Sequence, residues 1–364
     1  MRLLRLLPQI RSSRRSSATK TVRAGRQGVQ AVRVITMPWR VLGFALGTSL
    51  VVVLALGPRL TSVAGAEAAG DAPPSAAPTS LQCGTVASTI LGRSVSYCVA
   101  LPADYNSSTT TRYPTLYYLH GLFEHERSWG DRGGQQILNG LLESGQAGEF
   151  LVVCPDGGKS FYVNSFDGKE RYEDFFVKEF VPSIDRMYRT RAEPAARGLS
   201  GDSMGGYGAL HLGMRHPDLF GSVSAQSAAL LPKFPDPLPT EGRWGFYARV
   251  LSGPFGSPLN ETYFDANNPL ILAEHPEQFS GLKLYFDCGD HDRYGFQEGN
   301  ELLDRELTEK HVPHEFHLRE GDHGWSYLSQ YMKYSLLFQW HCFEQAGHPA
   351  GARASKSQPE GRTR

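Results

Sequence analysis

Residues 197–207 read Arg-Gly-Leu-Ser-Gly-Asp-Ser-Met-Gly-Gly-Tyr, and this stretch decides the fold. It places the pattern Gly201-x-Ser203-x-Gly205 between a short apolar segment and a helix-like segment from Met204 to His216. This is the setting of a nucleophile elbow, a sharp turn from strand to helix that exposes a serine hydroxyl above a sheet. Glycines are needed on both sides of the serine because the two backbones approach too closely for a Cβ atom. The pattern therefore predicts that Ser203 is a nucleophile.

Short apolar runs alternate with longer helix-like stretches on both sides of this turn. The alternation predicts an α/β fold in which a mostly parallel central sheet is covered by helices on both faces. The interval from Ala229 to Gly281 is too long for an ordinary crossover, so we expect irregular helices there that roof the site. The expected strands are Tyr113 to Leu119, Phe150 to Cys154, Ala196 to Ser200, Gly221 to Ala225, Lys283 to Cys288 and His314 to Leu318. The expected helices are Gly134 to Ser144, Tyr172 to Tyr188, Met204 to His216, Gln297 to Lys310 and Ser326 to Phe343.

A serine hydroxyl is a weak nucleophile at neutral pH, so Ser203 needs a base, and the base needs a carboxylate to orient it. In parallel sheets, functional residues gather at the carboxyl ends of the strands. His323 lies between two glycines in a loop directly after the last expected strand. We therefore expect His323 to be the base.

Two aspartates could orient His323. Asp290 and Asp292 both lie in the loop that follows the strand at residues 283–288. Asp287 is still within that strand and is expected to be structural. With either loop aspartate, the chain order is serine, aspartate, histidine, as in α/β-hydrolases. On these residues alone, both loop aspartates remain candidates.

Acyl transfer also needs two N–H donors for the oxyanion of its tetrahedral intermediate. The Met204 N–H lies at the start of a helix, where the positive end of the helix dipole favours negative charge. Leu122 follows the first core strand, where the second donor is expected. His120 is expected to support this loop by hydrogen bonding rather than to act as a second base.

Four aromatic residues lie near the expected strand ends and are candidates for lining a substrate site, although aromatic residues in such loops are about as often simple packing. They are Trp129, Phe161, Tyr162 and Trp325.

Two groups of residues could be mistaken for metal sites. His311, His314 and His317 are spaced by three, but Pro313 interrupts a helix, and a strand would point the last two to opposite faces. The three aspartates at residues 287–292 lack the regular ligand array of a calcium loop. Since a serine hydrolase needs neither, we expect no metal and no cofactor.

The motifs together resemble one family. LHGL at residues 119–122, GLSGDSMGGYGAL at 198–210, FDCGDHD at 286–292 and GDHGW at 321–325 look like the putative esterase (esterase D-like) family of α/β-hydrolases. That family includes feruloyl and acetylxylan esterases, S-formylglutathione hydrolases, short-chain tributyrin-type esterases and secreted mycolyltransferases. The resemblance spans about residues 81–345.

The resemblance assigns a role to each matching position. It implies that Ser203 is the nucleophile, that Asp292 rather than Asp290 is the acid, and that His323 is the base. It also implies that Leu122 and Met204 donate to the oxyanion.

The net charge of zero hides an uneven distribution. Residues 1–66 hold eleven of the 37 Lys and Arg and no Asp or Glu, which leaves 26 basic against 37 acidic residues in the rest. Nucleic-acid binding relies on clustered Lys and Arg, so the acidic body argues against such a partner.

The basic segment is expected to be a targeting leader. An Arg-rich stretch precedes the uncharged run Val41 to Pro58, and Ala64-Gly65-Ala66 has the form of a signal-peptidase site. The protein is therefore expected to be secreted or periplasmic. The run of 18 residues is also close to the length of a membrane span, so an anchor at residues 41–58 is the alternative. Translation from Met37 would give a leader of more usual proportions, and this also remains open.

Outside the leader, composition divides the chain into a disordered linker at residues 67–80, an esterase domain at 81–345 and a disordered tail at 346–364. Five cysteines leave at least one thiol without a partner in the chain. If a two-residue turn at Gly92-Arg93 joins the first two strands, Cys83 lies about 13 Å from the position opposite Cys98, too far for a disulfide. Such a bridge needs a bulge or another register. Cys154 and Cys288 are expected in the core.

The sequence thus predicts an exported serine esterase that uses a Ser-His-Asp triad on a short-chain or aromatic acyl ester, with an alcohol that could be a sugar. The alternatives are a mycolyltransferase-like acyltransferase, an S-formylglutathione hydrolase-like thioesterase and, least favoured, a non-catalytic binding protein on the same scaffold. The expected partner is a small-molecule or carbohydrate-linked ester. The oligomeric state is not predicted.

Overall fold

A computed structural model describes residues 79–235 and 237–347, which belong to one compact unit, Ala69–Arg364. The predicted leader and its possible anchor, most of the linker and nearly all of the tail lie outside the described residues. Within this part of the chain, no helix is both long enough and apolar enough to cross a membrane.

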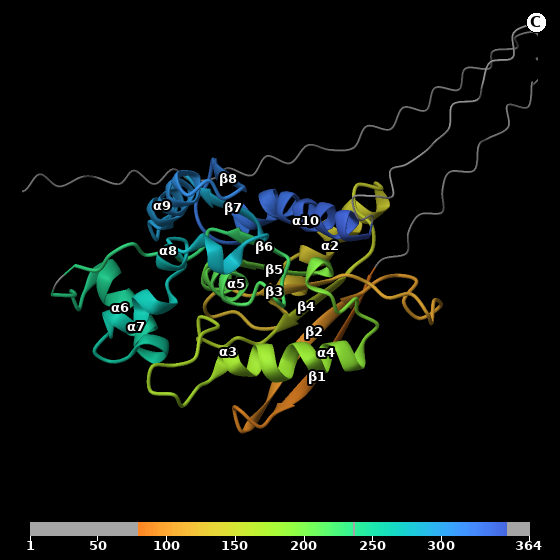
Figure 1. Cartoon of the computed structure of the whole chain (residues 1–364), viewed down its shortest axis with the longest axis horizontal. Coiled ribbons are helices and arrows are strands. Elements are labelled where there is room, and N and C mark those ends of the chain that lie inside the picture. The colour runs from red at the N-terminus through yellow and green to blue at the C-terminus, as the bar shows by residue number, and fades with distance from the viewer. Residues whose placement is uncertain (1–78, 236, 348–364) are drawn as a thin grey trace, which may run out of the picture. The chain divides into compact units, whose positions relative to one another are not determined.

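The predicted α/β architecture is confirmed (Figure 1). Eight strands form one sheet in the order β1-β2-β4-β3-β5-β6-β7-β8. β1 and β2 are antiparallel to their neighbours, and the other six strands run parallel. The strands are β1 (Ser80–Ser88), β2 (Arg93–Leu101), β3 (Thr115–Leu119), β4 (Leu151–Pro155), β5 (Arg197–Asp202), β6 (Ser222–Gln226), β7 (Lys283–Gly289) and β8 (His314–Arg319).

The helices follow the predicted pattern as well. Each expected helix is present with its ends shifted by a few residues, and the stretch after Tyr172 contains one π-helical turn. The helices are α1 (Ser128–Asp131), α2 (Gly134–Glu143), α3 (Tyr172–Phe175), η1 (Phe176–Phe180), α4 (Val181–Met187), η2 (Pro194–Ala196), α5 (Met204–Arg215), α6 (Gly242–Phe255), α7 (Glu261–Asn267), α8 (Pro269–Leu272), η3 (Pro276–Phe279), α9 (Phe296–Glu309) and α10 (Trp325–Gly347).

Helices cover both faces of the sheet because alternate strand residues point to opposite sides. On β3, Leu116 and Tyr118 pack into a core cluster shared with α2 and α10. Tyr117 and Leu119 pack into a second cluster shared with α3, η1, α4, α5 and α9. Figure 1 shows α2 and α10 on one side of the sheet and α3 and α4 on the other. A sheet buried on both faces explains why β3 and β4 are almost continuous apolar runs.

The first hairpin differs from the two-residue turn considered above. β1 ends at Ser88 and β2 begins at Arg93, so four residues form the turn, and Cys83 pairs directly with Cys98 in a disulfide. The turn is held by Glu179 of η1, whose carboxylate accepts from the main-chain N–H groups of Thr89 (3.1 Å) and Ile90 (3.3 Å). A contact 90 residues away in sequence therefore holds the four-residue turn, and local turn preferences did not reveal it. Cys154 and Cys288 are buried, as predicted.

The long interval after β6 forms the predicted roof. It contains α6, α7, α8 and η3 before β7 begins at Lys283. Figure 1 shows α6 and α7 together beyond the end of α8, at one side of the described unit. Of these helices, α6 lines the pocket described below.

Candidate active site

The turn between β5 and α5 has the geometry of a nucleophile elbow. Ser203 has φ 54° and ψ −116°, a backbone conformation that is costly for a residue with a side chain. A Cβ on Gly201 would lie 2.7 Å from the Leu119 carbonyl oxygen, and one on Gly205 would collide with that same carbonyl. The strain is held in place because the Ser203 N–H donates to the Gln226 carbonyl (2.9 Å) of β6. Both glycines are therefore required by the close approach of β3 to the turn.

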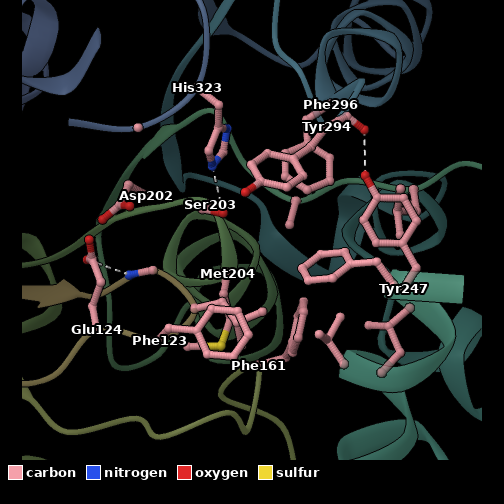
Figure 2. Close-up of a pocket in the computed structure, with 18 residues that line it drawn as sticks. Phe123, Glu124, Phe161, Asp202, Ser203, Met204, Tyr247, Tyr294, Phe296 and His323 are labelled. Atoms are coloured by element: carbon pink, nitrogen blue, oxygen red, sulfur yellow. Dashed lines mark hydrogen bonds between the residues drawn. The ribbon is translucent and has the colours of Figure 1, made fainter. Parts of the chain in front are cut away.

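Three predicted site residues from three separate loops form one chain of hydrogen bonds. His323 donates from Nδ1 to Asp292 Oδ2 (2.7 Å), and its Nε2 accepts from the Ser203 hydroxyl (3.0 Å). Figure 2 shows the bond between His323 and Ser203. Asp292 is 4% exposed, so its charge acts on the imidazole with little screening by water. This bond directs the second ring nitrogen toward Ser203, the orientation that a general base requires.

The residues around Asp292 fix its carboxylate. Asp292 Oδ1 accepts from the Tyr294 N–H (2.9 Å), and the Cys288 thiol lies 3.8 Å from Oδ2. The rings of Tyr294 and Phe296 pack edge-to-face against His323, with centroids 4.8 Å and 5.4 Å from its own. The imidazole is thus held by packing as well as by hydrogen bonds.

The two other aspartates of this region face elsewhere. Asp290 accepts from the His291 ring (2.6 Å) and from the Gly321 N–H (3.0 Å). Asp287 is buried and accepts from the hydroxyls of Tyr285 and Tyr327, each at 2.7 Å. Burial raises the pKa of Asp287 to about 6. Asp287 therefore has the structural position expected from its place within the strand.

The two predicted oxyanion donors, Leu122 and Met204, line the pocket beside Ser203. Met204 is the first residue of α5, so its N–H has no acceptor within that helix. The His120 ring donates from Nδ1 to the Gly121 carbonyl (2.8 Å) and accepts at Nε2 from the Gly157 N–H (2.8 Å). His120 thus supports the loop that carries Leu122, as predicted.

Two carboxyl groups at one end of the pocket were not predicted. Glu124 closes the loop turn by accepting from the Gly121 N–H (3.2 Å), and it also pairs with Arg132. Asp202, directly before the serine, accepts from the Tyr118 hydroxyl (2.7 Å). Burial, and then the charge of Glu124, raise the pKa of Asp202 to about 7. In Figure 2 both carboxyl groups lie across Ser203 from Tyr247 and Phe296.

Of the four aromatic residues expected to line the substrate site, only Phe161 does so. Trp129 is 1% exposed and packs beside Tyr118 in the core cluster of α2 and α10. Tyr162 is completely buried, and its hydroxyl donates to the His120 carbonyl (3.1 Å). Trp325 begins α10 and packs against the same core cluster as Trp129. These three rings lie outside the pocket lining, because proximity to a strand end does not say which face of the loop a ring will take.

Most of the apolar lining comes from residues that were not singled out individually, although many of them lie in the interval that was expected to roof the site. Four residues of α6 face the pocket, at positions 246, 247, 250 and 251. This is the spacing of one face of a helix, and it was visible in the sequence. Two aromatic residues come from the segment just after Asp292, and Phe123 lies at the mouth, where it is 64% exposed. The apolar lining residues that were not predicted are Phe123, Ala229, Leu231, Phe246, Tyr247, Val250, Leu251, Tyr294 and Phe296.

The histidines considered as metal ligands have other contacts. His314 Nε2 lies 3.0 Å from Asp304 Oδ1, and its Nδ1 donates to the Val312 carbonyl (2.7 Å). The His317 ring packs against Tyr285. Among residues 79–235 and 237–347, no three His, Cys, Asp or Glu side chains are grouped so that they could share a metal ion.

Comparison with known proteins identifies the fold and the family. A family model described as "Putative esterase" matches residues 88–337. An esterase of Mycobacterium tuberculosis is 29% identical over 252 residues, which cover 62% of this chain and 51% of that protein. The chain thus spans about half the length of this relative.

Two further matches extend over most of their own lengths. An acetyl esterase of Caldicellulosiruptor saccharolyticus is 26% identical over 234 residues, covering 62% of this chain and 82% of that protein. The solved structure of a ferulic acid esterase superimposes with a TM-score of 0.62 at 27% identity, covering 73% of this chain and 99% of that one.

Proposed function

The chain belongs to the putative esterase family, and we propose that it is a serine carboxylic ester hydrolase with Ser203 as its nucleophile. The observation that carries the proposal is the chain of hydrogen bonds from Asp292 through His323 to the Ser203 hydroxyl, at the floor of an aromatic pocket. The activities named for the relatives above support the same reaction class.

In the acylation half of the reaction, His323 Nε2 takes the proton of the Ser203 hydroxyl as its oxygen attacks the ester carbonyl. The imidazolium that forms is stabilised by the Asp292 carboxylate at Nδ1. The tetrahedral oxyanion accepts from the Leu122 and Met204 N–H groups. When the intermediate collapses, the C–O bond to the alcohol breaks, and the alcohol oxygen takes the proton from His323 Nε2.

The deacylation half repeats these steps with water. His323 removes a proton from a water molecule, whose oxygen attacks the acyl carbonyl and forms a second oxyanion. Collapse of this intermediate breaks the bond to Ser203, which recovers its proton from His323. The products are a carboxylic acid and an alcohol, and the enzyme returns to its starting state without a cofactor.

We further propose that the acyl group is short or aromatic. The rings of Phe161, Tyr247 and Phe296 offer flat apolar surfaces beside Ser203, which suit an aromatic or a short aliphatic acyl group. The acidic body disfavours polyanionic substrates. A sugar-like alcohol and action outside the cytoplasm remain part of the proposal, supported by the leader-like residues 1–66.

The reaction is tested with the Ser203→Ala variant. Because the alanine side chain cannot attack the carbonyl, we expect kcat for p-nitrophenyl acetate to fall by about 10⁴-fold or more. A fluorophosphonate probe should label the wild-type protein at Ser203 and leave the variant unlabelled. Ser329→Ala, which removes an exposed hydroxyl of α10, is the control and should behave as wild type. If Ser203→Ala keeps more than about a tenth of the activity, the assignment fails.

The substrate class is tested with p-nitrophenyl esters of graded chain length, beside feruloylated and acetylated sugars. The proposal expects short or aromatic acyl groups to give the highest kcat/KM. A steady increase from C4 to C16 would indicate a lipase. Transfer to trehalose that outpaces hydrolysis would indicate an acyltransferase.

Export is tested by intact-mass measurement of the protein from its native source. Cleavage after Ala66 predicts a mature chain that begins near Glu67. Full-length chain in detergent extracts of membranes would instead support the anchor at residues 41–58.

A further inference from the structure

The loops that carry Asp292 and His323 are joined by a second set of contacts. These contacts involve Arg293, the residue after Asp292, and Asp322, the residue before His323. Asp322 Oδ1 accepts from the main-chain N–H groups of both Arg293 (2.8 Å) and His323 (2.7 Å). Asp322 Oδ2 forms an ion pair with the Arg293 guanidinium. The dipeptides Asp292-Arg293 and Asp322-His323 are therefore paired twice, once through the imidazole and once through the Asp322 carboxylate.

The backbone around His323 needs such a constraint. Gly321 has φ 143° and Gly324 has φ 102°, and neither carries a Cβ that would limit its conformation. Contacts with Asp290 and His291 hold Gly321, and the first turn of α10 holds Gly324. Asp322 is the side chain that binds the N–H of His323 itself. Without it, the main chain of His323 would keep only the long hydrogen bond from the Arg293 guanidinium to its carbonyl (3.4 Å).

The charge of Asp322 is stable over the pH range in which an esterase is assayed. The hydrogen bond from Arg293 lowers the pKa of Asp322 to about 2, and the N–H donors of His323 and Arg293 act in the same direction. The carboxylate therefore accepts all of these bonds throughout that range.

We infer that Asp322 is a positioning residue, which holds the backbone of His323 so that its imidazole reaches Asp292 and Ser203 together. The inference rests on the proposed function, because it assigns to Asp322 an effect on the reaction through His323. Misplacing a reacting group by about 1 Å can cost about 100-fold in rate. Loss of Asp322 should thus lower kcat more than it changes KM.

The test compares Asp322→Ala with Asp322→Asn. The alanine variant loses both N–H contacts and the ion pair, and we expect kcat to fall about 10- to 100-fold with KM nearly unchanged. The asparagine variant keeps a carbonyl oxygen for the two N–H groups and loses only a half-exposed ion pair, so kcat should stay within about fivefold of wild type. Rates are expressed per folded molecule, and the melting temperature of each variant is measured.

Glu170→Ala is the matched control. It removes another exposed ion pair, with Arg93, whose side chains are 45% and 42% exposed, and it should leave kcat unchanged. The inference is overturned if Asp322→Ala keeps kcat within threefold. It is also overturned if the alanine and asparagine variants lose kcat equally, or if the loss disappears once rates are corrected for the folded fraction.

Proton NMR provides a readout that does not depend on turnover. The His323 Nδ1 proton shared with Asp292 should give a low-field resonance, which is assigned by its absence in His323→Gln. We expect Asp322→Ala to broaden or shift this resonance and Asp322→Asn to retain it. If the wild-type protein hydrolyses no ester, the proposed function is wrong. If the resonance is unchanged in Asp322→Ala, the positioning role of Asp322 is wrong, whatever the activity.

Discussion

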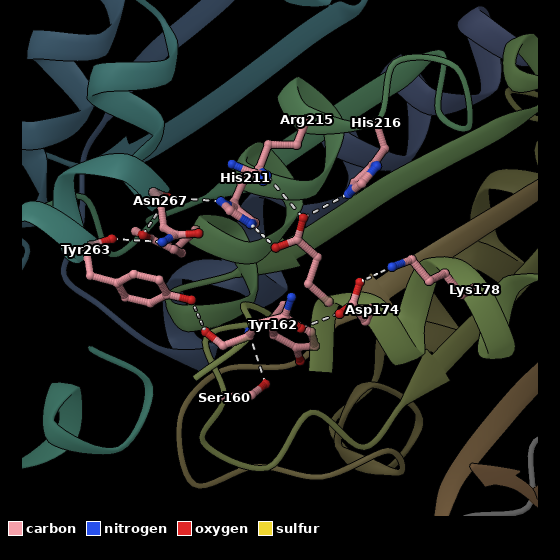
Figure 3. Close-up of polar contacts among 12 residues, drawn as sticks. Ser160, Tyr162, Asp174, Lys178, His211, Arg215, His216, Tyr263 and Asn267 are labelled. Atoms are coloured by element: carbon pink, nitrogen blue, oxygen red, sulfur yellow. Dashed lines mark hydrogen bonds and ion pairs between the residues drawn. The ribbon is translucent and has the colours of Figure 1, made fainter. Parts of the chain in front are cut away.

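Two pairs of a histidine and a buried carboxylate in the described part of the chain differ in what the histidine faces, and the pair of His323 and Asp292 faces a nucleophile. At the pocket, His323 donates to Asp292 at 2.7 Å. Below the roof, Nε2 of His211 in α5 lies 3.0 Å from Glu173 of α3 (Figure 3). The His211 side chain is completely buried, whereas that of His323 is 11% exposed.

The difference lies at the second ring nitrogen. His323 Nε2 faces the Ser203 hydroxyl, which has a proton to give. His211 Nδ1 donates to the Asn267 carbonyl at 2.9 Å, and a carbonyl has no proton to give. A histidine–carboxylate pair therefore indicates catalysis only when the remaining nitrogen faces an activatable group in a pocket.

The Glu173 cluster joins three elements instead. Glu173 also binds His216 (2.9 Å) and Arg215 (3.1 Å), at the end of α5. Asn267, which closes the roof helix α7, accepts from Tyr207 (2.7 Å) as well as from His211. Burial opposes ionisation, but the hydrogen bonds from the two histidines and the charge of Arg215 hold the pKa of Glu173 well below its usual range. The cluster thus binds the roof to the nucleophile helix.

The largest effect that tests this contrast is expected at Asp292. Asp292→Asn removes the charge that orients His323, and kcat should fall by about 10⁴-fold while the folded state is retained. Asp290→Asn should change kcat little, because Asp290 contacts His291 and Gly321 rather than His323. Steady-state kinetics on p-nitrophenyl acetate compare the two variants. If Asp290→Asn causes the larger loss, the role of the acid moves to Asp290.

The opposite result is expected for the second pair. Glu173→Ala leaves His211, Arg215 and His216 without their buried carboxylate, which should destabilise the fold by about 3–5 kcal/mol. The folded fraction should keep kcat within a few-fold of wild type. Urea denaturation and kinetics on the same preparation measure both quantities.

Glu193→Ala serves as the control for this stability change. It removes the more exposed ion pair with Arg191 (2.7 Å), and exposed pairs contribute at most about 1 kcal/mol. A loss of activity without a loss of stability in Glu173→Ala would show that the two pairs do not differ as described here.

Sequence patterns were sufficient for the elements and for the residues at strand ends. The six parallel strands were predicted because short strand-like segments alternate with longer helix-like stretches along the chain. His323 lies within hydrogen-bonding distance of both Asp292 and Ser203 because the carboxyl ends of parallel strands meet at one edge of the sheet.

Features that depend on distant contacts were not predictable in this way. The turn between β1 and β2 is held by Glu179 from a distant helix, and the burial of Trp129 and Tyr162 depends on how the loops pack. Asp322 was read only as part of a motif, since its bonds to Arg293 and His323 exist only after two loops have met.

The smallest predicted effect concerns Asp202, a buried carboxyl whose donor is a tyrosine rather than a histidine. Burial raises the pKa of Asp202 to about 7, so the folded state binds more protons than the unfolded state between about pH 4 and pH 7, and this group makes stability fall as the pH rises. The contribution of Glu173 to stability has the opposite pH dependence. Because its pKa is depressed in the folded state, this contribution is present above about pH 4.5 and is lost as the pH falls. Asp202→Asn keeps an acceptor for Tyr118. The change that it causes in the free energy of unfolding should be more favourable at pH 8 than at pH 5, by about 1–2 kcal/mol. Urea denaturation at both pH values measures this, and an equal change at pH 5 and pH 8 would mean that Asp202 is already ionised in the folded protein at pH 5.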